Sequence, residues 1–506
     1  MRTVNAGAPR RGCGRPTCRC ALSLSRPAVI AGGSWVPSGH PTADGQVGRR
    51  VDAARTSRTS HAWGAARRAG GDRRRAPEGA RARGPRPLAT IGRTRRRPPE
   101  DAVLRLSNPT REYPWGSPTA IFDLLGEDPT GEPAAELWLG AHPAAPSVVE
   151  TTDGEQRLDE LIARDAESVL GRDVVARFGR TLPYLLKVIA VARPLSLQVH
   201  PSLERAREGF AAEEAAGIDL MDRRRSYKDR NHKPELVHAL TRFEGLCGFR
   251  APRRVVELLA DLDAPLAQAI HHLLAGDPTA QGIRTAFRRL LEPELRPAPE
   301  EVGEVVEACR RRLAAGASPS PRADRTVVLL GEAYPGDPGV VTSLLLNPVT
   351  LEPGEAMFVP SGGVHAYLDG TAVEVMANSD NVLRAGLTTK HIDVPELLAN
   401  VDYVAAPPIR IAPEVVNEVT RVYYAPVDDF ELSVTEVPAG GAHPLPGRGP
   451  RIVFCLDGEV RITAETDDSI DLARGQSAFV PASDGALTIE GIGADGAGRV
   501  VQADVP

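Results

Sequence analysis

The chain has 506 residues and a net charge of −5, which is enough length for several domains of ordinary size. Residues 1–100 hold 22 Arg, no Lys and 5 acidic residues and so carry +17, which leaves −22 on the remainder. An acidic body of this kind has no electrostatic reason to bind nucleic acid. No window approaches the roughly 18 apolar residues of a membrane span, and no secretory signal is visible. We therefore expect a cytoplasmic protein with no nucleic-acid or membrane partner.

Residues 1–102 are predicted to form a disordered arm. They are rich in Arg, Gly, Pro, Ala and Ser and lack apolar periodicity, so they cannot bury a core. A basic arm that binds nucleic acid or a membrane is one interpretation, and an organellar transit peptide is another. We favour a third, an upstream stretch read from a misassigned start. Because no Met lies between Met1 and Met221, the true start would then be a valine codon such as Val103.

The six cysteines are scattered and suggest no disulfide framework, which agrees with a reducing cytoplasm. The stretch "CGRPTCRC" lacks paired C-x2-C spacing and falls in the predicted arm, so we expect no metal site there. The cysteines are Cys13, Cys18, Cys20, Cys247, Cys309 and Cys455.

Ordered structure is predicted to begin at about residue 103. Residues 103–250 mix short strands with turns and helices: 157–171 has helical spacing, 182–191 reads as a buried strand, and a helix follows Pro201 and Ser202. Four amphipathic segments then fill 251–316 with an apolar period of three to four residues. We therefore predict a helical domain, residues 251–322, inserted into a strand-rich domain formed by 103–250 and 323–405.

After this insertion we predict a linker rich in Gly, Pro and Ser. Short strands separated by Pro/Gly turns then return and are typical of a jelly-roll barrel. Residues 406–506 supply a second set, in which "ARGQSAFVPASDGALTI" repeats the pattern of "EPGEAMFVPSGGVHAYL" without its histidine. The predicted fold class is mainly β, with two related jelly-roll barrels and an inserted α-helical domain. Only the first barrel keeps polar side chains inside.

Three predicted strands carry polar side chains on one face, because a period of two sends alternate residues to opposite faces. The polar sets are Ser196, Gln198 and His200; Lys233 and Glu235; and His365, Tyr367 and Asp369. Two imidazoles, one carboxylate and one amide oxygen suit zinc or a similar divalent ion. Those four groups belong to Gln198, His200, Glu235 and His365. Taken singly, each histidine has a structural or surface role as its alternative, and we assign that role to His232 and His238.

Lysine is rare in this chain, with four Lys against 57 Arg. A retained Lys suggests a compact ammonium that guanidinium cannot replace, and Lys binds phosphate as a point charge. Cations around a metal therefore favour a small, phosphorylated, anionic substrate. The lysines are Lys187, Lys228, Lys233 and Lys390, of which Lys228 is most easily explained as a surface residue.

From about residue 103 to the end, the chain resembles the type I mannose-6-phosphate isomerases (phosphomannose isomerases) of the cupin superfamily. The resemblance rests on "YPWGS", "AELWLGAHP", "LPYLLKVIA", "LSLQVHP", "NHKPEL", "FVPSGGVHAYLDG" and "VEVMANSDNVLRAGLTTKHID", found in that order. It implies a cupin enzyme with one Zn2+ per chain that interconverts mannose 6-phosphate and fructose 6-phosphate. We expect it to act as a monomer. The family usually has Pro where this chain has Thr389, and Pro114 stands where some members carry a polar residue; neither change removes a ligand.

By motif position, the resemblance places the metal ligands on Gln198, His200, Glu235 and His365. It places the active-site arginine on Arg384 and an acidic residue of the cavity on Glu374. The other pocket residues fall on Trp115, Glu136, Lys187, Ser196, Lys233, Tyr367 and Lys390.

Isomerisation moves a proton between C1 and C2 through an enediol, which needs a base there and positive charge nearby. Arg384 is always protonated and so suits the charge, which leaves Glu374 as the preferred proton shuttle. A metal-bound water or a lysine is the alternative base. Arg384 could instead pair with Asp380, and Trp115 and Tyr367 could be packing aromatics.

Two rival functions are a non-catalytic double cupin that binds sugar phosphates and an iron-dependent cupin oxygenase. Loss of a ligand or of Arg384 would favour the first, and none is lost. A glutamine ligand with lysines nearby argues against the second, which prefers histidine ligands.

Overall fold

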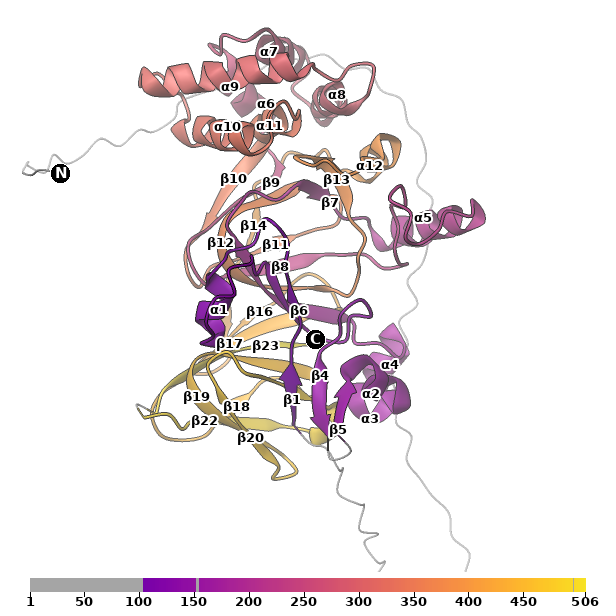
Figure 1. Ribbon diagram of the computed structural model, residues 1–506, viewed down its shortest axis with the longest axis vertical. Coiled ribbons are helices and arrows are strands. Elements are labelled where there is room, and N and C mark those ends of the chain that lie inside the picture. The colour runs from indigo at the N-terminus through magenta and orange to yellow at the C-terminus, as the bar shows by residue number, and fades with distance from the viewer. Residues whose placement is uncertain (1–102, 152–153, 495) are drawn as a thin grey trace, which may run out of the picture. The chain divides into compact units, whose positions relative to one another are not determined.

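The structure is a computed structural model that describes residues 103–151, 154–494 and 496–506. Those residues are mainly β, in two large antiparallel sheets, with a group of helices next to the first sheet (Figure 1). The predicted arm, with Cys13, Cys18 and Cys20, lies outside the described residues. Within them, no helix is long and apolar enough to cross a membrane.

The first sheet has 11 strands, and β12 is the strand on which it is organised. β12 pairs with β7 and β9 through its first residues and with β6 and β8 through residues 370–377. Gly370 lies at this change of partners with φ 110°, and a Cβ there would lie 2.4 Å from the Arg242 carbonyl oxygen. Only glycine allows that approach. The strands are β2 (Thr110–Arg111), β3 (Glu136–Leu139), β6 (Tyr184–Val191), β7 (Leu197–Val199), β8 (Glu235–Ala239), β9 (Phe243–Phe249), β10 (Leu346–Leu351), β11 (Ala356–Val359), β12 (His365–Ala377), β13 (Leu383–Gly386) and β14 (Ile409–Ile411).

The prediction of a buried strand at 182–191 is confirmed by β6, whose eight residues are all buried. Its alternate residues Tyr184, Leu186 and Val188 belong to an apolar core that also contains Phe454 and Phe479 of the second sheet. A period of two therefore turns Lys187 to the opposite face, towards the interior of the first sheet. One strand thus supplies packing on one face and a buried charge on the other.

The second sheet has 12 strands, and three of them come from the beginning of the described chain. β1 pairs with β21, with Leu104 opposite Phe479, and β4 and β5 follow β1 in the sheet. Residues 103–250 were predicted to belong with the first set of strands, whereas β1, β4 and β5 pair within the second sheet. Pairing between segments so far apart in the chain leaves no local pattern. The strands are β1 (Leu104–Ser107), β4 (Val148–Thr151), β5 (Gly154–Arg157), β15 (Glu414–Val415), β16 (Thr420–Tyr423), β17 (Glu431–Val437), β18 (His443–Leu445), β19 (Arg451–Ala464), β20 (Ser469–Ala473), β21 (Ser477–Val480), β22 (Leu487–Gly491) and β23 (Gly498–Asp504).

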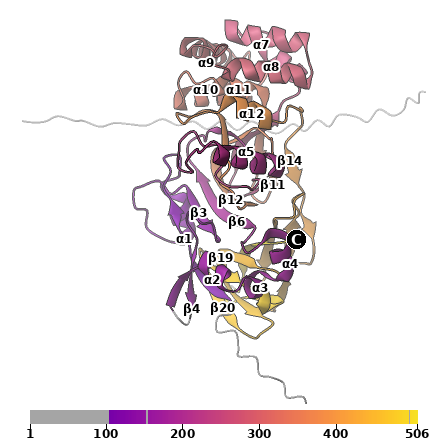
Figure 2. The same cartoon turned by 90° about the vertical axis from the view of Figure 1, so that its right-hand side faces the viewer.

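Six helices lie between β9 and β10 in the sequence and pack together in one apolar core with β7, β9 and β13 (Figures 1 and 2). A proline opens α6, α7, α9 and α10 in their first turns, where its missing N–H costs no hydrogen bond. The helices are α6 (Pro252–Leu259), α7 (Pro265–Gly276), α8 (Ala280–Leu291), α9 (Pro299–Ala314), α10 (Pro321–Ala333) and α11 (Gly339–Thr342).

The helical group continues past the predicted boundary at residue 322. α10 begins at Pro321, and strands return only at Leu346. The stretch before α10 is rich in Gly, Pro and Ser and was interpreted as a linker to strands, whereas Pro321 starts a helix there and Val327 and Leu330 bury its apolar face.

The remaining helices are short or lie on the surface of the sheets. The helix predicted over 157–171 is divided at Asp165, whose side chain accepts a hydrogen bond from the Ser168 N–H and so caps a new helix. The predicted start of the helix after Pro201 is confirmed, because Ser202 caps α5. These helices are α1 (Ala120–Leu125), α2 (Leu158–Arg164), α3 (Ala166–Leu170), α4 (Arg172–Phe178), α5 (Leu203–Ala215) and α12 (Val394–Asn400).

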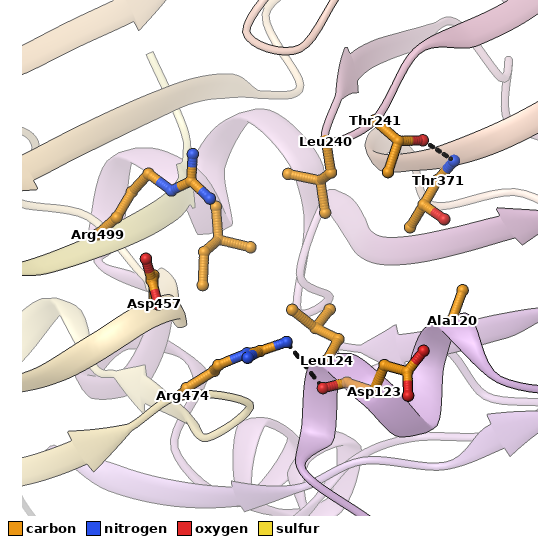
Figure 3. Close-up of a pocket in the computed structure, with 10 residues that line it drawn as sticks. Ala120, Asp123, Leu124, Leu240, Thr241, Thr371, Asp457, Arg474 and Arg499 are labelled. Carbon is orange, nitrogen blue, oxygen red and sulfur yellow. Dashed lines mark hydrogen bonds between the residues drawn. The ribbon is translucent and has the colours of Figure 1, made fainter. Parts of the chain in front are cut away.

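A cavity of about 420 Å3 lies where α1 and the turns after β8 and β20 meet (Figure 3). Arg474 closes one side by donating to the Asp123 carbonyl oxygen at 2.8 Å, and the Thr371 N–H donates to Thr241 Oγ1 at 2.9 Å on another. None of the predicted site residues lines this cavity.

Asp324 should be essential to the stability of the helical group. Its buried carboxylate forms an ion pair with Arg312, whose guanidinium also donates to the Leu258 carbonyl oxygen. Replacing Asp324 with Ala leaves the arginine charge buried and unpaired, which should lower the free energy of unfolding by about 3 kcal/mol. Urea unfolding followed by circular dichroism measures this. Glu257→Ala, which breaks the exposed Arg254–Glu257 pair, is the control and should change little; equal effects of the two would contradict the prediction.

Candidate functional site

Three predicted ligands come together in the interior of the first sheet. The ligating atoms of His200, Glu235 and His365 all lie within 4.8 Å of one another, and the three side chains are buried. His200 Nε2 is 3.1 Å from Glu235 Oε1, and His365 Nε2 is 3.5 Å from Glu235 Oε2. No other group of this kind occurs in the described part of the chain.

Each of these three ligands stands at the end of a strand or directly after it. His200 directly follows β7, Glu235 is the first residue of β8, and His365 is the first residue of β12. Gln198 is the register partner of both His365 on β12 and Arg384 on β13. Residues directly opposite each other in a sheet point to the same face, so Gln198 lies in the row that connects the histidine cluster with Arg384.

Both histidines are oriented for binding through Nε2. Nδ1 of His200 is 2.8 Å from the Asn381 carbonyl oxygen, and Nδ1 of His365 is 3.0 Å from the Gly363 carbonyl oxygen. A carbonyl oxygen only accepts, so each Nδ1 carries the proton and each Nε2 keeps its lone pair. Burial, together with Lys233, lowers the pKa of His200 to about 4, and burial lowers the pKa of His365. Both rings are therefore neutral at neutral pH, as metal ligation requires.

A cation already faces the same ligand atoms. The Lys233 ammonium contacts Glu235 Oε1 and lies 3.5 Å from His200 Nε2. Burial acts to raise the pKa of Glu235, but Lys233 and the two histidines outweigh it and hold that pKa well below its ordinary value. The Tyr367 hydroxyl donates to the other oxygen, Glu235 Oε2, at 2.7 Å. An ionised carboxylate with two neutral imidazoles and a neighbouring amide is a donor set that fits a divalent cation such as zinc.

A second buried group of charges surrounds Lys187 on β6. Lys187 is the register partner of Trp138 on β3 and of Glu374 on β12, so the three side chains form one row across the sheet. Its ammonium lies 3.2 Å from Glu374 Oε2, 3.7 Å from Glu136 Oε2 and 5.3 Å from the Trp138 ring centroid. The prediction did not assign a role to Trp138, although it shares a strand face with Glu136.

The pKa values in this second group are shifted strongly. Burial acts to lower the pKa of Lys187, but Glu136 and Glu374 outweigh burial and raise it, so the ammonium stays charged. Burial and the Glu235 charge raise the pKa of Glu374 to about 7, although Lys187 opposes them. A carboxyl group with a pKa near 7 can both take and release a proton at neutral pH.

Arg384 has no ion pair or side-chain hydrogen bond within the ranges that the structure describes. The alternative of a salt bridge with Asp380 is wrong, because Asp380 Oδ1 lies 3.4 Å from His142 Nε2 instead. His142 also packs its ring edge-on against Trp138 at 4.9 Å. Burial lowers the pKa of Arg384 from its ordinary value, yet an arginine remains charged at any physiological pH.

The other predicted residues lie farther from these contacts. Trp115 packs against the apolar group that contains Tyr367 and stacks on Tyr113 at 5.8 Å. Ser196 lies just before β7 and is half-buried. Lys390 is exposed in the turn after β13. Sequence reasoning did not identify His142, which acts through its ring. It also missed Asn381 and Gly363, since a partner that acts through its backbone oxygen leaves no side-chain pattern.

Antiparallel sheets with a buried cluster of two histidines and a glutamate at strand ends define a metal-binding β-protein of the cupin class. Residues 103–252 match the family described as phosphomannose isomerase type I, catalytic domain, and residues 420–494 match the mannose-6-phosphate isomerase cupin domain. The chain belongs to the type I mannose-6-phosphate isomerase family.

Relatives from distant organisms support this membership. Mannose-6-phosphate isomerase of Escherichia coli (strain K12) is 41% identical over 394 residues, which cover 77% of this chain and 98% of the relative. The Homo sapiens enzyme is 33% identical over 413 residues, covering 76% and 94%. A crystal structure of a zinc-bound mannose 6-phosphate isomerase aligns with a TM-score of 0.72 and 38% identity, over 80% of this chain and 100% of the other.

Replacing His365 with Ala should weaken zinc binding by at least about 100-fold, because a ligand and its preset orientation are both lost. Equilibrium dialysis against zinc, with metal measured by mass spectrometry, gives the affinity and stoichiometry. His238→Ala is the matched control: His238 is equally buried on β8 but faces away, towards the Tyr423 ring. Unchanged zinc affinity in His365→Ala would contradict the assignment.

Proposed function

We propose that the chain is a metal-dependent isomerase that interconverts D-mannose 6-phosphate and D-fructose 6-phosphate. Its family membership supports this reaction, since the relatives above carry that name. The observation that carries the proposal is that two buried groups lie close together. One is the cation-binding cluster around Glu235, and the other is the carboxyl group of Glu374 beside Lys187, which can exchange a proton. An aldose–ketose isomerase needs both.

We infer that one zinc ion per chain is held by Gln198, His200, Glu235 and His365. Three features support this ligand set. Both imidazoles are neutral with the Nε2 lone pair free, Glu235 is ionised, and Gln198 is the register partner of His365. When bound, zinc supplies a Lewis acid for the oxygens on C1 and C2. Tyr367 orients Glu235 by donating a hydrogen bond to Oε2. The Lys233 ammonium contacts Glu235 Oε1; it would give up this contact when a cation binds there and would remain near the sugar.

In the proposed reaction, Glu374 takes the proton from C2 of the open-chain aldose and returns it to C1. Lys187 holds the carboxylate in place at 3.2 Å, and Glu136 and the Trp138 ring hold Lys187. Arg384, which has no anionic partner in the described part of the chain, is free to stabilise the negative charge of the enediolate. We assign the phosphate to Ser196, Lys390 and the nearby cations, and sugar contacts to Trp115, Glu136, Lys187, Lys233 and Tyr367.

The proposed architecture behind this site is two cupin-type barrels with an inserted α-helical domain. The catalytic barrel would use the strands of the first sheet, and the C-terminal barrel those of the second sheet from about residue 406. The strands of the second sheet enclose an apolar cluster that includes Val453, Ile462 and Ile489, and this cluster supports a barrel without metal ligands. We infer that the enzyme acts in the cytoplasm as a monomer.

The full-length protein should convert mannose 6-phosphate to fructose 6-phosphate in a coupled assay. Chelation should abolish the activity, because the reaction needs the cation that the buried ligands hold, and added zinc should restore it. Iron added in place of zinc tests the oxygenase alternative. A folded, zinc-loaded protein without turnover would overturn the proposed function.

Glu374→Gln should lower kcat by about 100-fold or more while leaving zinc content intact, since the amide cannot exchange the proton. In the wild type, kcat should fall as the pH drops through the pKa of Glu374, because the protonated carboxyl is no longer a base. Burial and the Glu235 charge raise this pKa from 4.5 to about 7, against the opposing charge of Lys187. A bound divalent cation would lower this pKa, so the acid limb should lie between these two values.

The pH profile of Glu374→Gln should lack this acid limb. Glu244→Gln is the matched control on the adjacent strand β9, where the carboxylate pairs with Arg242 and Arg322 instead. An unchanged acid limb in Glu374→Gln would exclude Glu374 as the base.

A further inference from the structure

The two strands β7 and β13 bring Gln198 and Arg384 together through a short ladder. β7 has three residues and β13 has four. Their register places Arg384 opposite Gln198 and Gly386 opposite Leu197, with an irregularity at Ala385 between them. A short ladder with a bulge tolerates slippage unless other contacts fix it.

The turn from Tyr334 to Gly339, which joins α10 to α11, contacts the segment that leads into β7. The Tyr334 hydroxyl donates to the Pro194 carbonyl oxygen at 2.6 Å, two residues before Ser196. The Tyr334 ring packs against the apolar core of the helical group. This hydrogen bond therefore ties the strand that carries Gln198 and precedes His200 to the helices.

The same turn contacts the end of β13 through Asp337. Asp337 Oδ1 accepts from the Gly339 N–H at 2.7 Å, and Oδ2 accepts from the Thr388 N–H at 3.3 Å. The backbones touch directly, since a Cβ on Gly386 would lie 2.9 Å from Gly339 Cα. Gly386 itself has φ 134°, so two glycines are needed at this contact.

Leu387 shows that the chain after β13 is held under strain. Its φ is 53°, in the left-handed region that a residue with a branched side chain rarely adopts. Such a conformation persists only where the surroundings determine it, and here the neighbours are Gly339 and Asp337. A cavity of about 500 Å3, lined in part by Asp337, Thr388 and Lys390, gives the turn room to move if these contacts are lost.

We propose that residues Tyr334–Gly339 form a brace that holds β7 and β13 in the register required for isomerisation, an inference that rests on the proposed function. Asp337 and Tyr334 are positioning residues, since they act through the backbones of Thr388 and Pro194 and not on the substrate. Through Asp337 the brace sets the place of Arg384 and Lys390. Through Tyr334 it sets the place of Gln198 and His200. The helical group thus has a catalytic purpose besides packing.

Asp337→Asn tests the first contact. The amide keeps the size of the side chain and one acceptor for the Gly339 N–H, but its NH2 group then faces the Thr388 N–H. Because Arg384 acts on the transition state, kcat should fall at least tenfold and KM should change less. Asp277→Asn is the matched control: Asp277 ends α7 within the same helical group and accepts from Thr279 Oγ1, far along the chain from β13.

Tyr334→Phe tests the second contact, with Tyr403→Phe as its control. Both substitutions remove a hydroxyl that donates to a backbone carbonyl, Pro194 in one case and Leu398 in the other. Tyr334→Phe should weaken zinc binding several-fold in dialysis, since it loosens the strand of Gln198 and His200. Tyr403→Phe should leave zinc binding unchanged.

A double-mutant cycle separates positioning from loss of stability. If Asp337 acts through Arg384, adding Asp337→Asn to Arg384→Ala should lower kcat by less than twofold further. A merely structural effect would lower kcat by the same factor in both backgrounds, or lower only Tm, and either result would overturn the proposal.

Hydrogen exchange followed by mass spectrometry gives a readout that does not depend on turnover. Peptides that span residues 383–390 should exchange at least tenfold faster in Asp337→Asn than in the wild type and in Asp277→Asn. Unchanged exchange would overturn the brace. A wild-type protein without isomerase activity would overturn the proposed function instead, and the exchange and zinc measurements would then decide on the brace alone.

Discussion

The carboxylate of Glu235 is a full charge in a place that water does not reach, and a buried charge is tolerated only when it is compensated on every side. One of its oxygens faces Lys233 and His200, and the other faces Tyr367 and His365. These partners come from the residues just before β8 and just after β7 and from the beginning of β12, so the ends of three strands must meet at one point. The long central strand β12, which changes partners at Gly370, makes that meeting possible.

A second carboxylate, Glu374, lies on the same central strand under the opposite electrostatic balance. Its pKa is raised to about 7 by burial and by Glu235, whereas the pKa of Glu235 is held well below its ordinary value by Lys233 and the histidines. Two carboxyl groups with pKa values pushed apart can divide a reaction between them, one binding a cation and the other exchanging a proton. The interdependence is physical, because the charge on the first is part of what makes the second a weak acid.

Strand periodicity was enough to predict the strand faces of three residues that contact Glu235. Alternation in "LSLQVHP" and "GVHAYLDG" places His200, His365 and Tyr367 on inward faces, and all three reach Glu235. Local patterns also placed β6 and the four amphipathic helices α6 to α9, since amphipathic spacing acts within one element. The same local reasoning failed at α10, where composition suggested a linker although Pro321 opens a helix.

The sequence by itself determined which residues have the chemistry for this site and on which strand faces they lie, because side-chain type and period-two alternation are local properties. Only the tertiary structure decided how strands far apart in the chain pair, such as β1 with β21, and which partner each charge finds. Asp380 illustrates the second point, since it lies next to His142 and leaves Arg384 without an ion pair in the described part of the chain. Pairing and burial depend on contacts between distant segments, and these set the pKa values of Glu374 and Glu235 that no local pattern contains.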